Sequence, residues 1–179
     1  QTKKQKLENM NELILSKLEV GSITNPVNLS GGHKKTVVLS GGGTKVLTLN
    51  DSGATCVFDT AAASNFTLPQ PELGMYFTFI QTIINTADHV IQCATNDHGF
   101  LGGVAIINTT ADQTNAFASA VDGANDFITL NATTSGGAAA GSIIHVAAVL
   151  GTGAVKAWAV HGTLIGSGAL VTPFGDAQL

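Results

Sequence analysis

The spacing of hydrophobic residues along the chain changes near residue 35. Over residues 6–19 apolar side chains recur at intervals of three and four, which predicts one amphipathic helix that ends at Gly21. Beyond residue 35, apolar and polar residues alternate in short runs separated by turn-forming residues, which predicts β-strands. We therefore divide the chain into an N-terminal helix and extended arm (1–34), a β-domain (35–165) and a C-terminal extension (166–179).

The predicted helix has an apolar stripe but no evident core of its own. Because a helix this short is marginal in water, we expect the stripe to dock onto its own domain, onto symmetry copies as a coiled coil, or onto a partner. The coiled coil is the weakest alternative, since Lys17 interrupts the seam. The stripe and the lysines beside it are the residues expected to bind a partner: Lys3, Lys4, Lys6, Leu7, Met10, Leu13, Ile14 and Leu18.

The β-domain is predicted from about ten short strands with turn signals every eight to twelve residues or so. These strands cover residues 35–40, 44–50, 55–60, 66–69, 75–84, 89–95, 103–110, 126–133, 142–150 and 154–165. Residues 112–121 are expected to form one helical turn or a loop, and the C-terminal extension to tuck under the domain or reach another subunit. This pattern is typical of an all-β, jelly-roll-like β-sandwich rather than of βαβ units.

Charge is scarce and unevenly placed. Only 11% of the residues are charged, compared with roughly 25% in an average soluble domain, and arginine is absent. Seven of the eight lysines precede residue 50, whereas residues 46–179 carry only Lys156 against nine acids. The β-domain has no basic surface for phosphates, so we expect no nucleic-acid binding. The N-terminal lysines either meet an acidic partner or only solvate an arm.

Nothing in the hydrophobic pattern predicts a membrane segment or a secretion signal. No apolar run reaches the roughly 18 residues of a membrane span, and the polar N-terminus is unlike a signal peptide. We therefore expect synthesis in the cytoplasm, no membrane partner, and incorporation into an assembly. Cys56 and Cys93 have no CxxC spacing and are expected to be buried thiols in strands.

Residues 47–80, LTLNDSGATCVFDTAAASNFTLPQPELGMYFTFI, form a recognisable module. A Thr-rich strand leads into a tight turn at 51–53, a second strand ends in Asp59, and T-L-P-x-P precedes Gly74 and an aromatic strand. The module resembles one that recurs in virion proteins of tailed bacteriophages, notably head decoration and fibre proteins. The later segments DFITLNAT, SIIHVAAV and KAWAVHGT are similar to the usual ending of such modules, in which Trp158 packs at the close of the sheet.

The resemblance implies a symmetric, trimeric structural protein on the capsid surface, made in the host cytoplasm. We expect a head decoration, or cement, protein whose partners are the major capsid protein and its own copies. The alternative is a tail or head fibre, or a receptor-binding module, in which the loops DHGFLGG and VDGAND hold a host glycan with an exposed Phe100. A carbohydrate-active enzyme on a β-scaffold is a third class, but it needs a carboxylate pair that the sequence does not indicate.

Candidate metal ligands are few, and we expect no enzyme activity, cofactor or bound metal. His89, Cys93, Asp97 and His98 are zinc-ligand types within ten residues, although a buried cysteine beside solvated turn residues fits them better. His145 and His161 are placed on neighbouring strands by a hairpin near residues 151–154. They are either core or interface histidines or, less favoured, metal ligands on a three-fold axis. Asp122 and Asp126 lack the remaining ligands of an EF-hand calcium loop.

Overall fold

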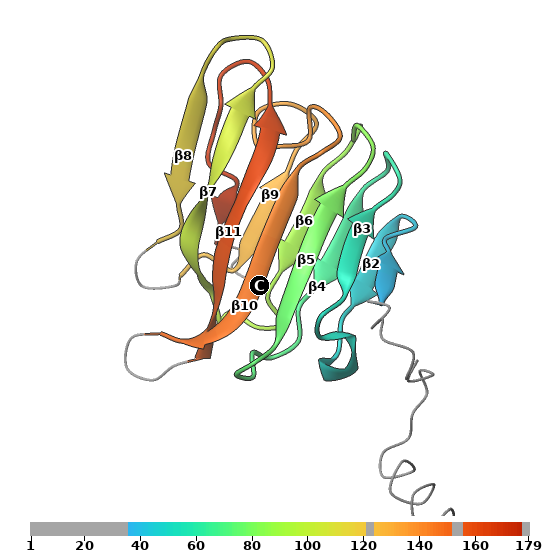
Figure 1. Ribbon diagram of the computed structural model, residues 1–179, viewed down its shortest axis with the longest axis vertical. Helices are drawn as coiled ribbons and strands as arrows, with labels where there is room; N and C mark the ends of the chain where they lie inside the picture. Colours follow the sequence, from blue (N-terminus) through green and yellow to red (C-terminus); the bar gives the residue numbers. More distant parts are fainter. Residues whose placement is uncertain (1–35, 121–123, 152–155, 177–179) are drawn as a thin grey trace, which may run out of the picture. The chain divides into compact units, whose positions relative to one another are not determined.

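The computed structural model describes residues 36–120, 124–151 and 156–176, which form a sandwich of two β-sheets (Figure 1). The seven-stranded sheet has the order β1 (Val37–Leu39), β3 (Thr55–Phe58), β5 (Tyr76–Gln81), β10 (Ile143–Leu150), β11 (Lys156–Gly166), β7 (Phe100–Asn108) and β8 (Thr114–Ala118). The five-stranded sheet has the order β12 (Phe174–Gly175), β9 (Phe127–Leu130), β6 (His89–Gln92), β4 (Ser64–Thr67) and β2 (Gly43–Val46). The predicted all-β sandwich is confirmed. The predicted N-terminal helix and its site residues lie outside the described residues.

The first six strands alternate between the two sheets. In the seven-stranded sheet β1, β3 and β5 pair in parallel, and in the other sheet β2, β4 and β6 also pair in parallel. Residues 37–92 therefore wind as successive turns of a two-sheet coil. Antiparallel pairing of β10 with β5 and of β9 with β6 then continues each sheet. The sequence pattern did not predict the parallel ladders, because inward and outward residues alternate in both kinds of pairing.

Two segments outside the predicted strands belong to the sheets. The prediction of a helical turn or loop at 112–121 is wrong, because β8 (Thr114–Ala118) pairs antiparallel with β7. Only Phe117 of this edge strand packs on the core, so its sequence lacks a repeated apolar alternation. At the C-terminus β12 pairs with β9 and Phe174 is buried, so this part of the extension tucks under the domain.

Aromatic side chains fill the space between the sheets. Phe66 of β4 contacts Phe58 and Phe79 of the opposite sheet, with ring centroids 5.0 and 5.5 Å apart. Trp158 of β11 is fully buried and lies 5.8 Å from Phe77. These rings supply large apolar areas to a core in which few other aromatic residues are needed.

A buried amide network joins the two sheets at one end of the sandwich. Gln81 Nε2 at the end of β5 donates to Asn85 Oδ1 at 2.7 Å, and Asn85 Nδ2 donates to the carbonyl of Leu130 in β9 at 2.6 Å. A side chain at Gly137 would collide with Asn85 and with the carbonyl of Asn131, so the loop after β9 closes directly over the network. This end of the sandwich is therefore tied by hydrogen bonds as well as by apolar packing.

Replacing Asn85 with alanine tests this network. The Asn85→Ala variant leaves the Leu130 carbonyl without its donor inside the protein, so we expect the free energy of unfolding to fall by about 2–3 kcal/mol. The exposed Asn96→Ala is the matched control and should change it by less than about 0.5 kcal/mol. Urea unfolding followed by circular dichroism measures both, and equal stabilities for the two variants would contradict the structural role of the network.

Candidate functional site: the outer face of the seven-stranded sheet

The register of the seven-stranded sheet aligns two complete rows of outward side chains across all seven strands. The first row contains Val37, Thr55, Thr78, His145, His161, Gly103 and Ala118, and the second contains Leu39, Val57, Ile80, Ile143, Thr163, Ala105 and Ala116. The residues between these rows face inward, and those with side chains pack in the core, as Cys56, Phe79 and Ile144 do. We call the surface that carries the two rows the uncharged face.

The uncharged face is apolar over most of its extent and holds no ion. In the seven strands the only charged residue is Lys156, which lies at the very start of β11. Large apolar residues are nevertheless well exposed on it: Val37 (56%), Leu39 (52%) and Ile143 (37%), together with Tyr76 (47%) and Ile107 (46%) at neighbouring outward positions. Contiguous exposure of this kind is typical of interaction surfaces.

The outer face of the five-stranded sheet has a different chemistry. Its outward positions include Asn65 and Thr67 on β4, Gln92 on β6 and Thr129 on β9. Gln92 Nε2 donates to Thr67 Oγ1 at 3.1 Å, so neighbouring polar side chains of this face bond to each other. A sheet that stays in water commonly has a polar outer face of this kind. The two outer faces of the sandwich are thus distinct, and the apolar one requires a partner.

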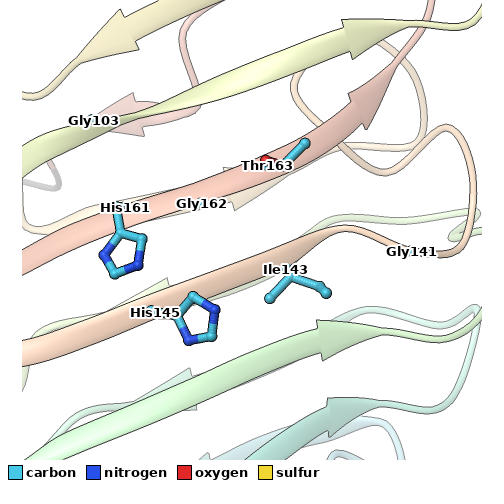
Figure 2. Close-up of a pocket in the computed structure, with 7 residues that line it drawn as sticks. All are labelled: Gly103, Gly141, Ile143, His145, His161, Gly162 and Thr163. Carbon is cyan, nitrogen blue, oxygen red and sulfur yellow. The ribbon is translucent and has the colours of Figure 1, made fainter.

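His145 and His161 lie side by side in the middle of the uncharged face (Figure 2). They are direct partners in the β10–β11 ladder, as the sequence predicted, and their rings stack with centroids 5.0 Å apart and an interplanar angle of 27°. The Nδ1 atom of His145 lies 3.1 Å from Thr78 Oγ1 of β5. Lone pairs of imidazole lie in the ring plane, so two stacked rings do not direct them at one ion.

Two shallow hollows flank the histidine pair. One, of about 420 Å³, is lined by both histidines together with Gly103, Gly162 and Ile143. Figure 2 shows that three of its lining residues are glycines, so the strands there carry no side chain above the backbone. The other, of about 300 Å³, lies toward Tyr76 and Ala159. The uncharged face is therefore uneven, with protruding rings and apolar side chains next to depressions.

The predicted zinc-type cluster does not come together. His89 and Cys93 point into the core, Asp97 is exposed, and His98 Nδ1 lies 3.1 Å from the Lys156 carbonyl. Among the described residues, no three His, Cys, Asp or Glu side chains are placed to hold a metal ion. Asp126 of the calcium candidate is buried, and its companion Asp122 lies outside the described residues.

His89 instead has a structural role. Its Nε2 atom lies 2.9 Å from the Thr60 carbonyl and 3.2 Å from that of Ala62, and because carbonyls only accept, this nitrogen carries the proton. The ring stacks on Phe58 with centroids 4.6 Å apart. Burial lowers the pKa of His89 below its ordinary value, with the two carbonyl contacts opposing the shift. The neutral imidazole is the form that fits this site.

The two cysteines are chemically quiet, as the sequence predicted. Cys56 and Cys93 are free thiols inside the core, and burial raises the pKa of each to about 12. Only the thiolate is a good nucleophile, so neither residue serves as one at neutral pH.

The exposed aromatic expected at a loop tip is absent from its predicted position. Phe100 is fully buried as the first residue of β7, where its backbone N–H bonds to the Asn125 carbonyl. The prediction of an exposed Phe100 is therefore wrong, because the residue opens a strand whose inward positions are 100, 104 and 106. In the described part of the chain, no helix is long and apolar enough to cross a membrane.

Comparison of the chain with models of protein families, with curated proteins and with solved structures found no match.

Sequence reasoning missed the uncharged face as a site. It found the histidine pair and the low charge, but it did not align the outward residues of seven strands into one surface. The usable signal is that the outward positions of these strands, such as Ile143 and Thr163, alternate with core residues yet are not charged. The order of the strands is what joins these positions, and it comes only from the structure.

The lowered pKa of His89 predicts a loss of stability in acid. Between the lowered pKa and the ordinary value near 6.5, the unfolded chain binds more protons than the folded protein, so stability rises with pH there and falls as the pH drops below about 6.5. We expect the melting temperature to be lower at pH 5.5 than at pH 7.5, and the difference to shrink in His89→Gln. An unchanged difference in this variant would assign the acid sensitivity to other groups.

Proposed function

We propose that this chain is a non-enzymatic structural subunit of a tailed-bacteriophage virion surface, a head decoration protein that assembles as a homotrimer and binds the outside of the shell. The observation that carries the proposal is the uncharged face, a seven-stranded surface without a charged residue in either of its two rows. A free protein gains nothing from exposing such a surface, whereas a subunit of an assembly buries it. The resemblance of residues 47–80 to virion modules supports the virion as that assembly.

The proposed mechanism is thermodynamic. A protein that binds the assembled shell but not its dissociated subunits stabilises the shell by mass action. Copies that are linked in a trimer bind the lattice with greater avidity than single copies do, because the second and third contacts are intramolecular. The tightly packed sandwich gives such a subunit a fixed shape, and its chemically quiet cysteines need no reducing environment.

The buried position of Phe100 weakens the alternative of a glycan-binding fibre, since the aromatic platform expected in its loop is not on the surface. The polar side chains on the outer face of the five-stranded sheet, such as Asn65 and Gln92, are ordinary for a solvated sheet. We therefore propose attachment to the shell, with the N-terminal stripe around Leu13 and Ile14 as the capsid-binding element.

A capsid-binding assay tests the proposal. Purified full-length chain is added to phage heads that lack it, and occupancy is read by particle imaging and by the temperature at which the heads release DNA. We expect regular lattice occupancy and a higher release temperature. The double variant Leu13→Asp, Ile14→Asp should lose about tenfold or more in affinity, because two apolar contacts are removed.

Leu73→Asp is the matched control for this assay, since Leu73 is an exposed apolar residue in a turn of the β-domain. It should bind as the unmodified chain does. Full-length chain that leaves the heads bare would refute the decoration function, and equal binding of the stripe variant would remove the stripe from the attachment site.

A further inference from the structure

We propose that copies of this chain contact each other through the uncharged face, with the stacked His145–His161 pair inside the contact. The inference deepens the proposed function and rests on it only for the claim that the chain works in an assembly. It names the surface and the occupant, a second copy of this chain, and it predicts how the contact responds to pH.

The uncharged face has the size that a subunit contact needs. Seven strands about 4.8 Å apart span roughly 29 Å, and a central strand of eight residues such as β10 is about 26 Å long. Their product is on the order of 700 Å², close to the roughly 800 Å² that each partner contributes to a stable interface. One face of the sandwich thus suffices for association.

The chemistry of the face suits a copy of itself better than a charged partner. Without an ion in its rows, the face offers nothing for an acidic or basic surface to pair with. Its polar groups are the hydroxyls of Thr55, Thr78 and Thr163 and the imidazoles of His145 and His161. Hydroxyl and neutral imidazole groups both donate and accept hydrogen bonds, so two identical faces can satisfy each other. Symmetric contacts require this property, because the same residues meet on both sides.

The relief of the face is also suited to a copy. The two hollows beside the histidine pair are lined by glycine and small side chains, and they lie next to the protruding Ile143 and Tyr76. A protruding apolar side chain from one copy therefore finds a depression on the next. The five-stranded sheet lacks this combination, since its outward residues are amides and hydroxyls that already bond to each other.

Burial of the histidine pair makes the contact sensitive to acid. The described residues that surround the pair on the face are Thr78, Gly103, Ile143, Ala147, Ala159 and Thr163, none of them charged. The nearest titratable group at an outward position is Tyr76, and Lys156 lies at the end of β11, so no carboxylate on this sheet balances an imidazolium. Protonating both rings places like charges 5.0 Å apart inside a contact that excludes water.

Sedimentation velocity on the full-length chain tests the surface. At pH 7.5 the chain should sediment as a trimer, and Ile143→Glu should sediment as a monomer. A second variant, Thr163→Glu, guards against misfolding of the first, since Thr163 is exposed and makes no core contact. Val46→Glu is the matched control, because Val46 is 70% exposed on the edge strand of the five-stranded sheet, and it should remain a trimer. Circular dichroism confirms that each variant is folded.

Thiol protection locates the contact directly. The native cysteines do not react because they are buried, so a cysteine introduced at Thr163→Cys or Val46→Cys is the only reactive thiol of the β-domain. We expect iodoacetamide to label the Thr163→Cys variant about tenfold more slowly than the Val46→Cys variant when both are trimers, and at similar rates after dilution to monomers.

Acid titration tests the histidine pair. The dissociation constant of the trimer should rise about tenfold or more between pH 7.5 and pH 5.5, the factor that one pKa unit of preferential proton binding produces. His161→Asn should associate at pH 7.5 and lose most of this pH dependence. Circular dichroism at both pH values separates this effect from the acid sensitivity of folding at His89.

The outcomes decide between occupants. A monomeric full-length chain, or a trimer that persists in both face variants, would overturn the proposal whatever the capsid assay shows. A monomer whose Thr163→Cys thiol is nevertheless protected would assign the face to the N-terminal segment of the same chain. Association with equal strength at pH 7.5 and pH 5.5 would place the histidine pair outside the contact.

Discussion

The backbone hydrogen-bond ladders of the seven-stranded sheet determine the rest of the molecule. Because neighbouring strands are held in one register, a single row of residues such as Val38, Cys56, Phe79 and Ile144 turns inward across the sheet while the rows on either side turn outward. The inward row builds the core against Phe66 and its neighbours. The same register gathers the outward residues into one continuous surface, and no single strand would carry enough apolar area to act alone.

The two sheets have different tasks in this account. The five-stranded sheet presents amides and hydroxyls that bond to each other and to water, which is the ordinary solution for a solvated face. The seven-stranded sheet presents apolar and small residues with a histidine pair in the middle. Both sheets share one core, so stability of the subunit and presentation of the uncharged face depend on the same packing. A structural protein needs a rigid surface of this kind more than it needs a reactive group.

Much of the fold follows from local sequence rules. The alternation in YFTFIQ and IIHVAAVL predicted β5 and β10, and the hairpin between β10 and β11 predicted that His145 and His161 would be partners. The edge strand β8 escaped prediction because four of its five residues are exposed, which leaves no alternation to read. Phe100 was misplaced because a Gly-rich context indicated a loop, whereas its side chain begins the inward row of β7.

The candidate site was harder to predict than the fold. Residues of one surface come from β1, β3, β5, β10, β11, β7 and β8, and their order in space differs from their order in the chain. Local periodicity shows which side of a strand is outward but not which strands are neighbours, and parallel coiling of residues 37–92 has no short sequence signal here. Low charge was visible in the sequence, yet it became informative only when the register showed that one whole face lacks ions.

The most direct test of the central claim is an electron cryo-microscopy structure of the assembled full-length chain at neutral pH. The account predicts that the seven-stranded sheets of neighbouring copies face each other, that His145 and His161 lie in the contact, and that the five-stranded sheets face solvent. An assembly joined through the five-stranded sheets, with Ile143 and Thr163 open to water, would contradict it.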